Sequence, residues 1–209
     1  AVPAMPALVG QVDVIKAVRL LPGVQAVGEG TSGFYVRGGA VDQNMILLDE
    51  ATVYNASHLM GFFSVFNSDA IKDLQLYKGG IPAEYGGRLS SVLDIRMKDG
   101  NNKKFSAQGG IGTISSRLTL EGPLMKNKMS FLLSGRRTYA DQFLRFSPDT
   151  NVRKNKLYFY DLNGKWNWKI NDNNRLFVSA YTGQDVFKFG DLFRLSWGNQ
   201  TVTTRWNHI

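Results

Sequence analysis

Regular alternation of apolar and polar side chains sets the second half of the chain apart. Within residues 157–170, tyrosine, leucine and tryptophan recur at even positions, and the odd positions from Asp161 to Lys169 are polar. Residues 129–139 alternate in the same way, and 175–187 do so less cleanly. A period of two over such lengths predicts β-strands with one apolar and one polar face. The strands predicted on this basis are 105–111, 114–122, 129–139, 157–170, 175–187 and 200–209, the first two as a hairpin around Gly112 and Thr113.

The predicted connections between these strands alternate in length. Residues 123–128 and 171–174 are short turns, whereas 140–156 and 188–199 are long and rich in Arg, Lys, Asp and Asn. Long strands with short turns at one end and long loops at the other are typical of outer-membrane barrels, with the apolar face toward lipid and the polar face toward a lumen. Trp and Tyr near strand ends fit an interfacial girdle. A soluble β-domain with one wet face is the alternative that the pattern leaves open.

The first 98 residues combine helix and strand signals. Asp13 is placed to cap a short helix that Pro22 and Gly23 end. The fully apolar run 45–48 suits a covered central strand. Ser68 or Asp69 is expected to cap a helical turn that leads into 74–77. Short strands are also predicted at 34–36 and 92–97.

Charge follows the same division of the chain. The 209 residues carry a formal net charge of +8. Residues 1–98 contain 8 Lys/Arg and 9 Asp/Glu, a net of −1, and residues 99–209 contain 17 and 8, a net of +9. All four tryptophans also lie in the second part. Such asymmetry indicates two structural units in two environments.

Composition excludes several kinds of site. There is no cysteine, which excludes a disulfide scaffold, a zinc–thiolate site, a cysteine nucleophile and an iron–sulfur cluster. With only His58 and His208, an all-histidine metal site is disfavoured, and no cofactor is expected. No apolar run reaches about 18 residues, so no transmembrane helix is expected. The first ten residues lack the basic and apolar regions of a signal peptide.

Three chemical interpretations of the sequence are weak. Residues 28–33 match GxGxxG, but a helix precedes them and a predicted strand follows, the reverse of a dinucleotide-binding motif. Lys and Arg are spread over loops and alternate strand positions without a dense patch, so no nucleic-acid partner is expected. Ser57 and His58 are adjacent in sequence, which is not triad geometry. We expect no enzymatic activity and no catalytic residue.

A series of short blocks occurs in a fixed order in the first half of the chain. They are LLPGV at 20–24, FYVRGG at 34–39, DQNMILLD at 42–49, NSDAIKD at 67–73, YKGGIPAEYGG at 77–87 and SVLDI at 91–95. In this order they resemble the plug domain of TonB-dependent outer-membrane receptors of the Bacteroidetes style. The part that follows resembles the first strands of the receptor's barrel, through LEGPL at 120–124 and SGRRTY at 134–139.

The resemblance implies an α+β plug domain followed by antiparallel strands of a transmembrane β-barrel, which has 22 strands in the complete family fold. We expect a linker at 1–10, the plug at 11–100 and the barrel strands at 101–209. About six strands are predicted, fewer than the roughly eight of the smallest single-chain barrels, so an incomplete barrel and a fragment are expected. No TonB box is recognised at the N-terminus.

The resemblance also implies a function and partners. The expected role is energy-coupled uptake of a nutrient ligand through the outer membrane of a Gram-negative bacterium, with the plug gating the barrel. TonB in the periplasm, outer-membrane lipid, the unidentified ligand and optionally a surface lipoprotein are the partners. The alternative is an outer-membrane barrel subunit with a structural or binding role and no active transport.

Candidate site residues follow from the same resemblance. Arg37 matches the first of two plug arginines that latch onto barrel glutamates in the family. Lys78 stands where the second would be, although a lysine cannot make the planar bidentate pair. Ligand contacts are expected in two plug loops and in the barrel loop 140–156; the plug candidates are Tyr54, Asn55, His58, Ile81, Glu84 and Tyr85.

Overall fold

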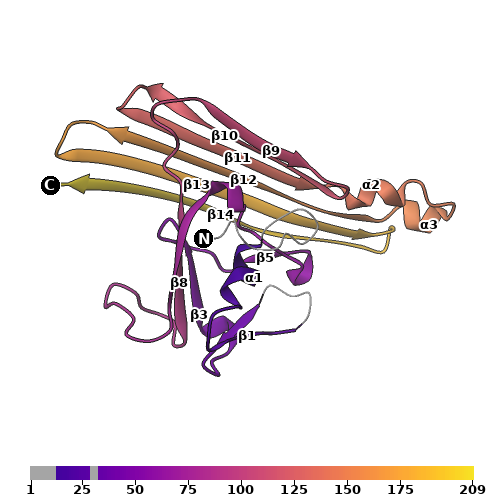
Figure 1. Ribbon diagram of the computed structural model, residues 1–209. Coiled ribbons are helices and arrows are strands. Elements are labelled where there is room, and N and C mark those ends of the chain that lie inside the picture. The colour runs from indigo at the N-terminus through magenta and orange to yellow at the C-terminus, as the bar shows by residue number, and fades with distance from the viewer. Residues whose placement is uncertain (1–12, 29–32) are drawn as a thin grey trace.

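The computed structural model describes residues 13–28 and 33–209. A six-stranded antiparallel sheet in the order β14-β13-β12-β11-β10-β9 forms one layer, which we call the wall sheet. The α/β unit, formed by residues 13–97, lies beneath one face of this sheet (Figure 1). The predicted linker 1–10 and most of the GxGxxG segment lie outside the described residues.

A four-stranded mixed sheet in the order β4-β3-β8-β7 organises the α/β unit. Strand β3 lies inside this sheet, parallel to β8 and antiparallel to β4, as expected for the apolar run 45–48. The buried side chains of α1 and β2 belong to the same apolar core as Leu93 and Ile95 of β8. The elements are α1 (Val14–Val18), β1 (Val24–Ala26), β2 (Phe34–Val36), η2 (Val41–Gln43), β3 (Asn44–Leu48), β4 (Ala51–Thr52), β5 (Ser57–His58), η3 (Leu59–Gly61), β6 (Phe63–Ser64), η4 (Ser68–Ala70), β7 (Ile71–Tyr77) and β8 (Ser91–Met97).

Two helical caps test the local predictions. Asp13 caps α1 as predicted, since its carboxylate accepts hydrogen bonds from the backbone N–H of Ile15 and Lys16. The cap predicted at Ser68 or Asp69 is wrong. Asn67 caps η4 instead, and its side-chain oxygen accepts from the N–H of Asp69. Asn accepts a hydrogen bond at an N-cap as readily as Ser or Asp, so the sequence did not distinguish the three residues.

The wall sheet confirms the number of strands and corrects one loop. Its strands follow one another as successive antiparallel neighbours. The long loop predicted at 188–199 is wrong, because β13 extends to Phe189 and β14 begins at Phe193. The N–H of Leu192 donates to the carbonyl of Phe189, and Gly190 takes a positive φ, which closes a tight turn. The elements are β9 (Ser106–Ile111), β10 (Ser115–Met125), β11 (Met129–Thr138), α2 (Ala140–Leu144), α3 (Thr150–Arg153), β12 (Lys156–Lys169), β13 (Asn174–Phe189) and β14 (Phe193–His208).

The two faces of the wall sheet differ as the alternation predicts. In β12, Asp161, Asn163, Lys165 and Asn167 are buried against the α/β unit, whereas Leu162 on the opposite face is half exposed. Leu132 and Tyr181 also face inward and join the apolar core of the α/β unit. The inward face is therefore mainly polar and packed, and the outward face is mainly apolar and open. Among the described residues, no helix is long and apolar enough to cross a membrane.

Candidate functional site

A buried histidine joins the α/β unit to the wall sheet. The His58 side chain lies between two carboxylates on neighbouring strands: Nε2 is 2.6 Å from Asp161 Oδ1, and Nδ1 is 2.6 Å from Asp185 Oδ2. His58 is 1% exposed, Asp161 0% and Asp185 2%. The ring stacks on Phe159, with centroids 4.2 Å apart. We call this group, together with Arg136 and Tyr181, the His58 cluster.

The geometry of the cluster sets the protonation state of the histidine. A carboxylate accepts hydrogen bonds, so a ring with a carboxylate at each nitrogen is held best as the doubly protonated cation. Burial by itself would lower the pKa of His58. The charge of Asp161 and the hydrogen bonds to Asp161 and Asp185 outweigh burial and raise the pKa above its ordinary value. The imidazolium and Arg136 then balance the two carboxylates.

Local backbone conformation and neighbouring side chains complete the cluster. Leu59 and Met60 adopt positive φ, which turns the chain so that the N–H of Leu59 donates to Asp185 Oδ1 at 2.7 Å. Arg136 donates to Asp161 through Nε at 2.8 Å and through Nη2, and Nη2 also donates to the carbonyl of Ser64. Asp161 on β12 therefore receives donors from both units, His58 of β5 and Arg136 of β11. Leu59 ties η3 to Asp185 on β13, and Arg136 ties β11 to Ser64 in β6.

Tyr181 reaches Asp161 because a glycine leaves room beside it. The Tyr181 hydroxyl donates to Asp161 Oδ1 at 2.8 Å. A Cβ on Gly183 would lie 2.0 Å from that hydroxyl oxygen and 2.7 Å from Asp161 Oδ1. Any side chain at position 183 would therefore displace the hydrogen bond. The hydrogen bond between Tyr181 and Asp161 therefore requires a glycine at the inward position 183.

A second buried ion cluster lies nearer the other end of the strands. Lys165 Nζ, on β12, is 3.1 Å from Asp49 Oδ2 and 3.1 Å from Asp99 Oδ1, and it donates to the carbonyl of Met97 at 3.0 Å. The lysine side chain is 4% exposed. Asp49 also accepts from the N–H of Met97, so the same carboxylate orders the end of β8. Lys165 thus fixes the end of β8 against the wall.

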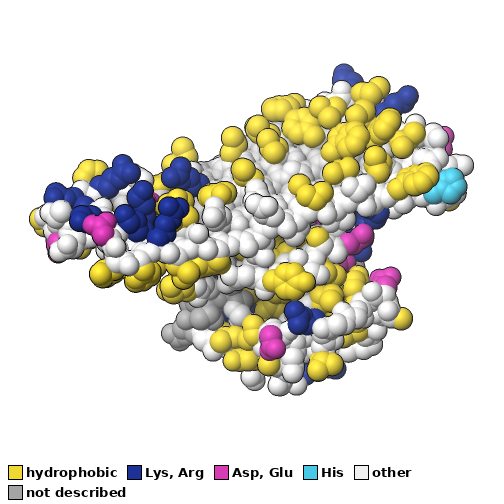
Figure 2. Space-filling view, turned by 180° about the vertical axis from the view of Figure 1, so that it is seen from behind, with side chains coloured by type: hydrophobic (Ala, Val, Ile, Leu, Met, Phe, Trp, Pro, Cys, Tyr) yellow, Lys and Arg dark blue, Asp and Glu magenta, His cyan; other side chains and the backbone are white. Residues whose placement is uncertain are grey.

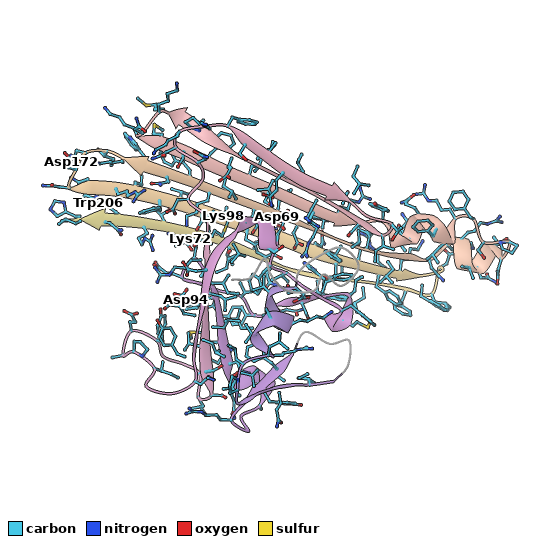
Figure 3. The ribbon with its side chains drawn as sticks, in the orientation of Figure 1. Asp69, Lys72, Asp94, Lys98, Asp172 and Trp206 are labelled. Atoms are coloured by element: carbon cyan, nitrogen blue, oxygen red, sulfur yellow. The ribbon has the colours of Figure 1, made fainter. Side chains whose placement is uncertain are left out.

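Further polar contacts extend between these clusters. Arg117 donates to Asp69 at 2.7 Å, and the Lys98 ammonium donates to the carbonyl of Asp69 at 2.6 Å. Figure 3 shows Asp69 and Lys98 directly beneath the wall sheet. Asn67 donates to Ser134 at 2.6 Å. At the edge strand β14, two contacts add to the interface: Arg205 with Glu50 at 2.7 Å, and Asn199 with the carbonyl of Asn55 at 2.7 Å.

These contacts pair opposite charges across the interface, so the charge asymmetry of the sequence becomes charge complementarity between the α/β unit and the wall sheet. The α/β unit and the segment that follows it supply acids, and the wall supplies the bases Arg117, Lys165 and Arg205. The His58 cluster reverses this sign, since there the wall supplies the carboxylates. The interface is therefore a polar seam with buried ions, which fixes position through charge and hydrogen-bond geometry.

Arg37 and Lys78, the two predicted latch residues, lie close to each other and make their described contacts within the α/β unit rather than with the wall sheet. Lys78 donates to the carbonyl of Pro22 at 2.6 Å, and the backbone N–H of Arg37 donates to the carbonyl of Gly23. A Cβ on Gly79 would lie 2.8 Å from Arg37 Nη1, so the guanidinium approaches the chain closely there. All of these contacts are within the α/β unit. A latch from Arg37 and Lys78 to barrel glutamates stays a prediction.

The predicted ligand-contact residues fall into two groups that the structure does not bring together. Tyr54 is 82% exposed in the loop before β5, and the carbonyl of Asn55 is held by Asn199. His58, in the same stretch, has both ring nitrogens occupied. The other candidates, Ile81, Glu84 and Tyr85, lie in the loop between β7 and β8, away from β5 (Figure 1).

Tyr85 is partly fixed within its loop. Its hydroxyl lies 3.5 Å from Asp94 Oδ2, and its ring is 5.6 Å from that of Tyr77. Burial, together with the charge of Asp94, raises the pKa of Tyr85. Ligand contact at both loops stays a prediction. Within the described ranges, no group of three or more His, Cys, Asp or Glu side chains is placed to hold a metal ion.

The sequence did not single out most residues of the seam. Asp161 and Lys165 are recognisable only as members of the polar parity in β12. The partners of His58 lie 103 and 127 residues away in sequence, so nothing near His58 indicates them. The usable signal was an ionisable residue at an inward position of a predicted strand. Such a residue needs a partner of opposite charge when it is buried.

Comparisons with known proteins agree with this architecture. Residues 6–92 match the family model described as the TonB-dependent receptor plug domain. The siderophore receptor PirA from Acinetobacter baumannii is 20% identical, with a TM-score of 0.59 over 85% of this chain and 30% of that chain. The outer membrane transporter YddB from Escherichia coli is 17% identical, with a TM-score of 0.65 over 98% and 35%. The copper transporter OprC is 13% identical, with a TM-score of 0.64 over 94% and 32%.

The chain spans about a third of the length of these structures. No curated protein matches it. The fold, the matched residues and the order of the two units agree with one another. Residues 6–92 therefore belong to the family of TonB-dependent receptor plug domains, and strands β9–β14 resemble the start of a TonB-dependent barrel.

Proposed function

We propose that this chain is the plug and opening barrel wall of an outer-membrane receptor that imports a nutrient ligand with energy transmitted by TonB. The observation that carries the proposal is the polar seam. A plug held by hydrogen bonds and ion pairs is positioned by directional contacts, each of which water can replace. Uptake rather than catalysis is the proposed activity. The plug at 11–100 and the wall at 101–209 are the proposed units.

The seam suggests how gating would work. Traction on the plug would strain the His58 cluster and the Lys165 cluster, which lie at different heights on the wall. Displacement would hydrate the charged groups on both sides and open a path along the polar inward face. The outward apolar face would remain in lipid. Tyr54 and Asn55 stand beside this path and are proposed to meet ligand that arrives from outside.

Uptake in strains with and without TonB tests the proposal. Radiolabelled ferric enterobactin and Cu²⁺ are the first probes, because the similar structures include siderophore receptors and a copper transporter. TonB-dependent accumulation through the complete gene product supports import. Binding without TonB-dependent accumulation would instead support the alternative, a barrel subunit with a structural or binding role.

A second readout does not depend on the ligand. Asn67 covers Ser134 on the inward face of β11. A cysteine introduced by Ser134→Cys should react with a maleimide faster in energised cells that contain TonB than in cells that lack it. A cysteine introduced by Tyr54→Cys is the control, because that position is open without plug movement. Equal labelling of Ser134→Cys in both strains would contradict plug displacement.

A further inference from the structure

Charge on the outer face of the wall sheet is confined to one end. Alternation and register place four cationic side chains on outward positions of β11–β14: Arg137, Lys156, Lys188 and Arg194. No outward position in the described strands β9–β14 holds an acid. All four cations lie toward the end of the sheet that bears α2 and α3. Figure 2 shows most Lys and Arg side chains of this view gathered at that end, hydrophobic side chains over the rest of the sheet, and a few further Lys or Arg side chains at the far corner.

Three of these cations form a row across neighbouring strands. Lys156 lies directly opposite Lys188, and Lys188 lies directly opposite Arg194. Like charges directly opposite each other on a sheet are destabilising. Asp191 is the nearby counter-charge, 3.6 Å from Lys188 and 2.6 Å from Lys154. One exposed carboxylate shared between two lysines leaves the row with excess positive charge, which an anion outside the protein would neutralise.

The same outward face has an apolar groove beside Arg137. The groove has a volume of about 870 Å³ and is lined by apolar side chains that include Leu118, Tyr160 and Leu162. It exists because Gly109 and Gly135 lie on either side of Leu118 in the register and carry no side chain. A Cβ on Gly135 would already lie 3.2 Å from Leu162 Cδ2. The floor of the groove is therefore backbone.

The spacing of the cations indicates the kind of headgroup. Arg137 is opposite Tyr160 at the end of the groove, and its guanidinium lies over the Tyr158 ring at 5.4 Å. Lys156 is four residues farther along β12. At about 3.3 Å per residue this is about 13 Å beyond Arg137 along the strand. Two separate anionic groups on one lipid fit this spacing better than one.

We propose that this face binds a phosphorylated acyl lipid of the outer leaflet. One acyl chain occupies the groove over Gly135, one phosphate contacts Arg137, and a second phosphate neutralises the row of Lys156, Lys188 and Arg194. Basic side chains beside a lipid-facing surface bind anionic headgroups in this way. The inference rests on the proposed function, because it requires the wall sheet to lie in the outer membrane with α2 and α3 outward.

Lipid binding by the purified complete gene product tests the inference. The probe is bisphosphorylated lipid A in phosphatidylethanolamine nanodiscs, compared with the same lipid after removal of both phosphates. The variant K156Q/K188Q/R194Q removes the row. The matched control K103Q/K126Q/K128Q removes the same charge from turns and loops at the opposite end of the strands. At roughly 1 kcal/mol per basic residue, the row variant should bind lipid A on the order of 100-fold more weakly.

The groove is tested separately from the headgroup. Gly135→Leu fills it and leaves all four cations in place, so the variant should lose affinity for lipid A without changing the affinity difference between the phosphorylated and dephosphorylated probes. Equal effects of the row variant and its control, or equal binding of the two probes by the unmodified protein, would overturn the inference. The outer face would then be an ordinary lipid-facing surface.

The lipid-binding experiment can succeed or fail independently of the import proposal. Lipid binding in nanodiscs needs neither TonB nor ligand. A protein that binds bisphosphorylated lipid A through the row but accumulates no ligand would retain this inference and lose the import proposal. A protein that imports ligand but does not distinguish the two lipid probes would retain the import proposal and lose this inference.

Discussion

Replacing His58 by glutamine should weaken the docking of the plug against the wall in a way that depends on charge. In the unmodified protein, the imidazolium and Arg136 balance Asp161 and Asp185 in a site with almost no solvent exposure. The glutamine amide in His58→Gln can donate to one carboxylate but carries no charge, so one buried negative charge is left without compensation. Removing one partner of a buried ion pair costs about 3–5 kcal/mol. We expect a loss of that size in plug stability.

The companion variants separate charge from packing. Asp185→Asn alone should cost less, about 1–2 kcal/mol, because His58 can then lose a proton and restore neutrality. In the double variant, Arg136 alone balances Asp161, so Asp185→Asn should recover part of the loss caused by His58→Gln. A coupling of about 2 kcal/mol or more between the two positions is the expected signature.

Urea unfolding of the plug inside the complete gene product measures these effects. A fluorophore on a cysteine at position 54, introduced by Tyr54→Cys in a background without other cysteines, reports on the loop next to the His58 cluster without disturbing a buried contact. A loss below about 1 kcal/mol for His58→Gln would refute the reasoning. So would additive losses in the double variant, because the histidine would then contribute packing alone.

Three further predictions use the same unfolding measurement. Because the pKa of His58 is raised, its contribution is complete below the unfolded pKa of about 6.5 and is lost as pH rises through the higher folded pKa. The stability difference between the unmodified protein and His58→Gln should shrink over that range, and a constant difference would contradict a charged ring. Lys165→Met should cost about 3–5 kcal/mol, whereas Lys169→Met, which breaks an exposed pair, should cost less than about 1 kcal/mol; similar losses would refute the burial argument. Asp13→Ala should cost about 0.5–2 kcal/mol through the lost cap of α1, and no change would show that the cap contributes nothing.

The positions of the wall strands and the face that each side chain occupies could be predicted, because both depend on the local alternation of apolar and polar residues. The parity of Asp161 and Lys165 in β12 identified the inward face before any partner was known. The sequence does not predict the hairpin at Gly190, because the Arg, Lys, Asp and Asn residues of 188–199 are typical of a loop. In the structure a Cβ on Gly198 would lie 2.2 Å from the carbonyl of Gly183. This glycine therefore marks a close approach of two strands rather than a loop.

The partners across the seam could not be predicted, for a different reason. A pattern along one chain segment gives no register between two units that are far apart in sequence. His58 is therefore predicted only as a ligand-contact residue of a plug loop, although both carboxylates beside it lie on predicted strands. Arg37 and Lys78 contact Pro22 and Gly23 in the structure, and their latch to barrel glutamates stays a prediction.

The polar character of the seam has a consequence for reversibility. A plug held by an apolar interface would expose hydrophobic surface each time it moved, and aggregation through that surface would compete with its return to the wall. Here buried Ser134, Asn163 and Asn167 line the inward face of the wall sheet, where Asn67 of the plug donates to Ser134, and Asp69 of the plug accepts from Arg117. The plug surface and the wall surface can both be hydrated when they are apart. In the proposed import cycle, water would therefore replace these contacts each time the plug leaves the wall, and the contacts would re-form on its return.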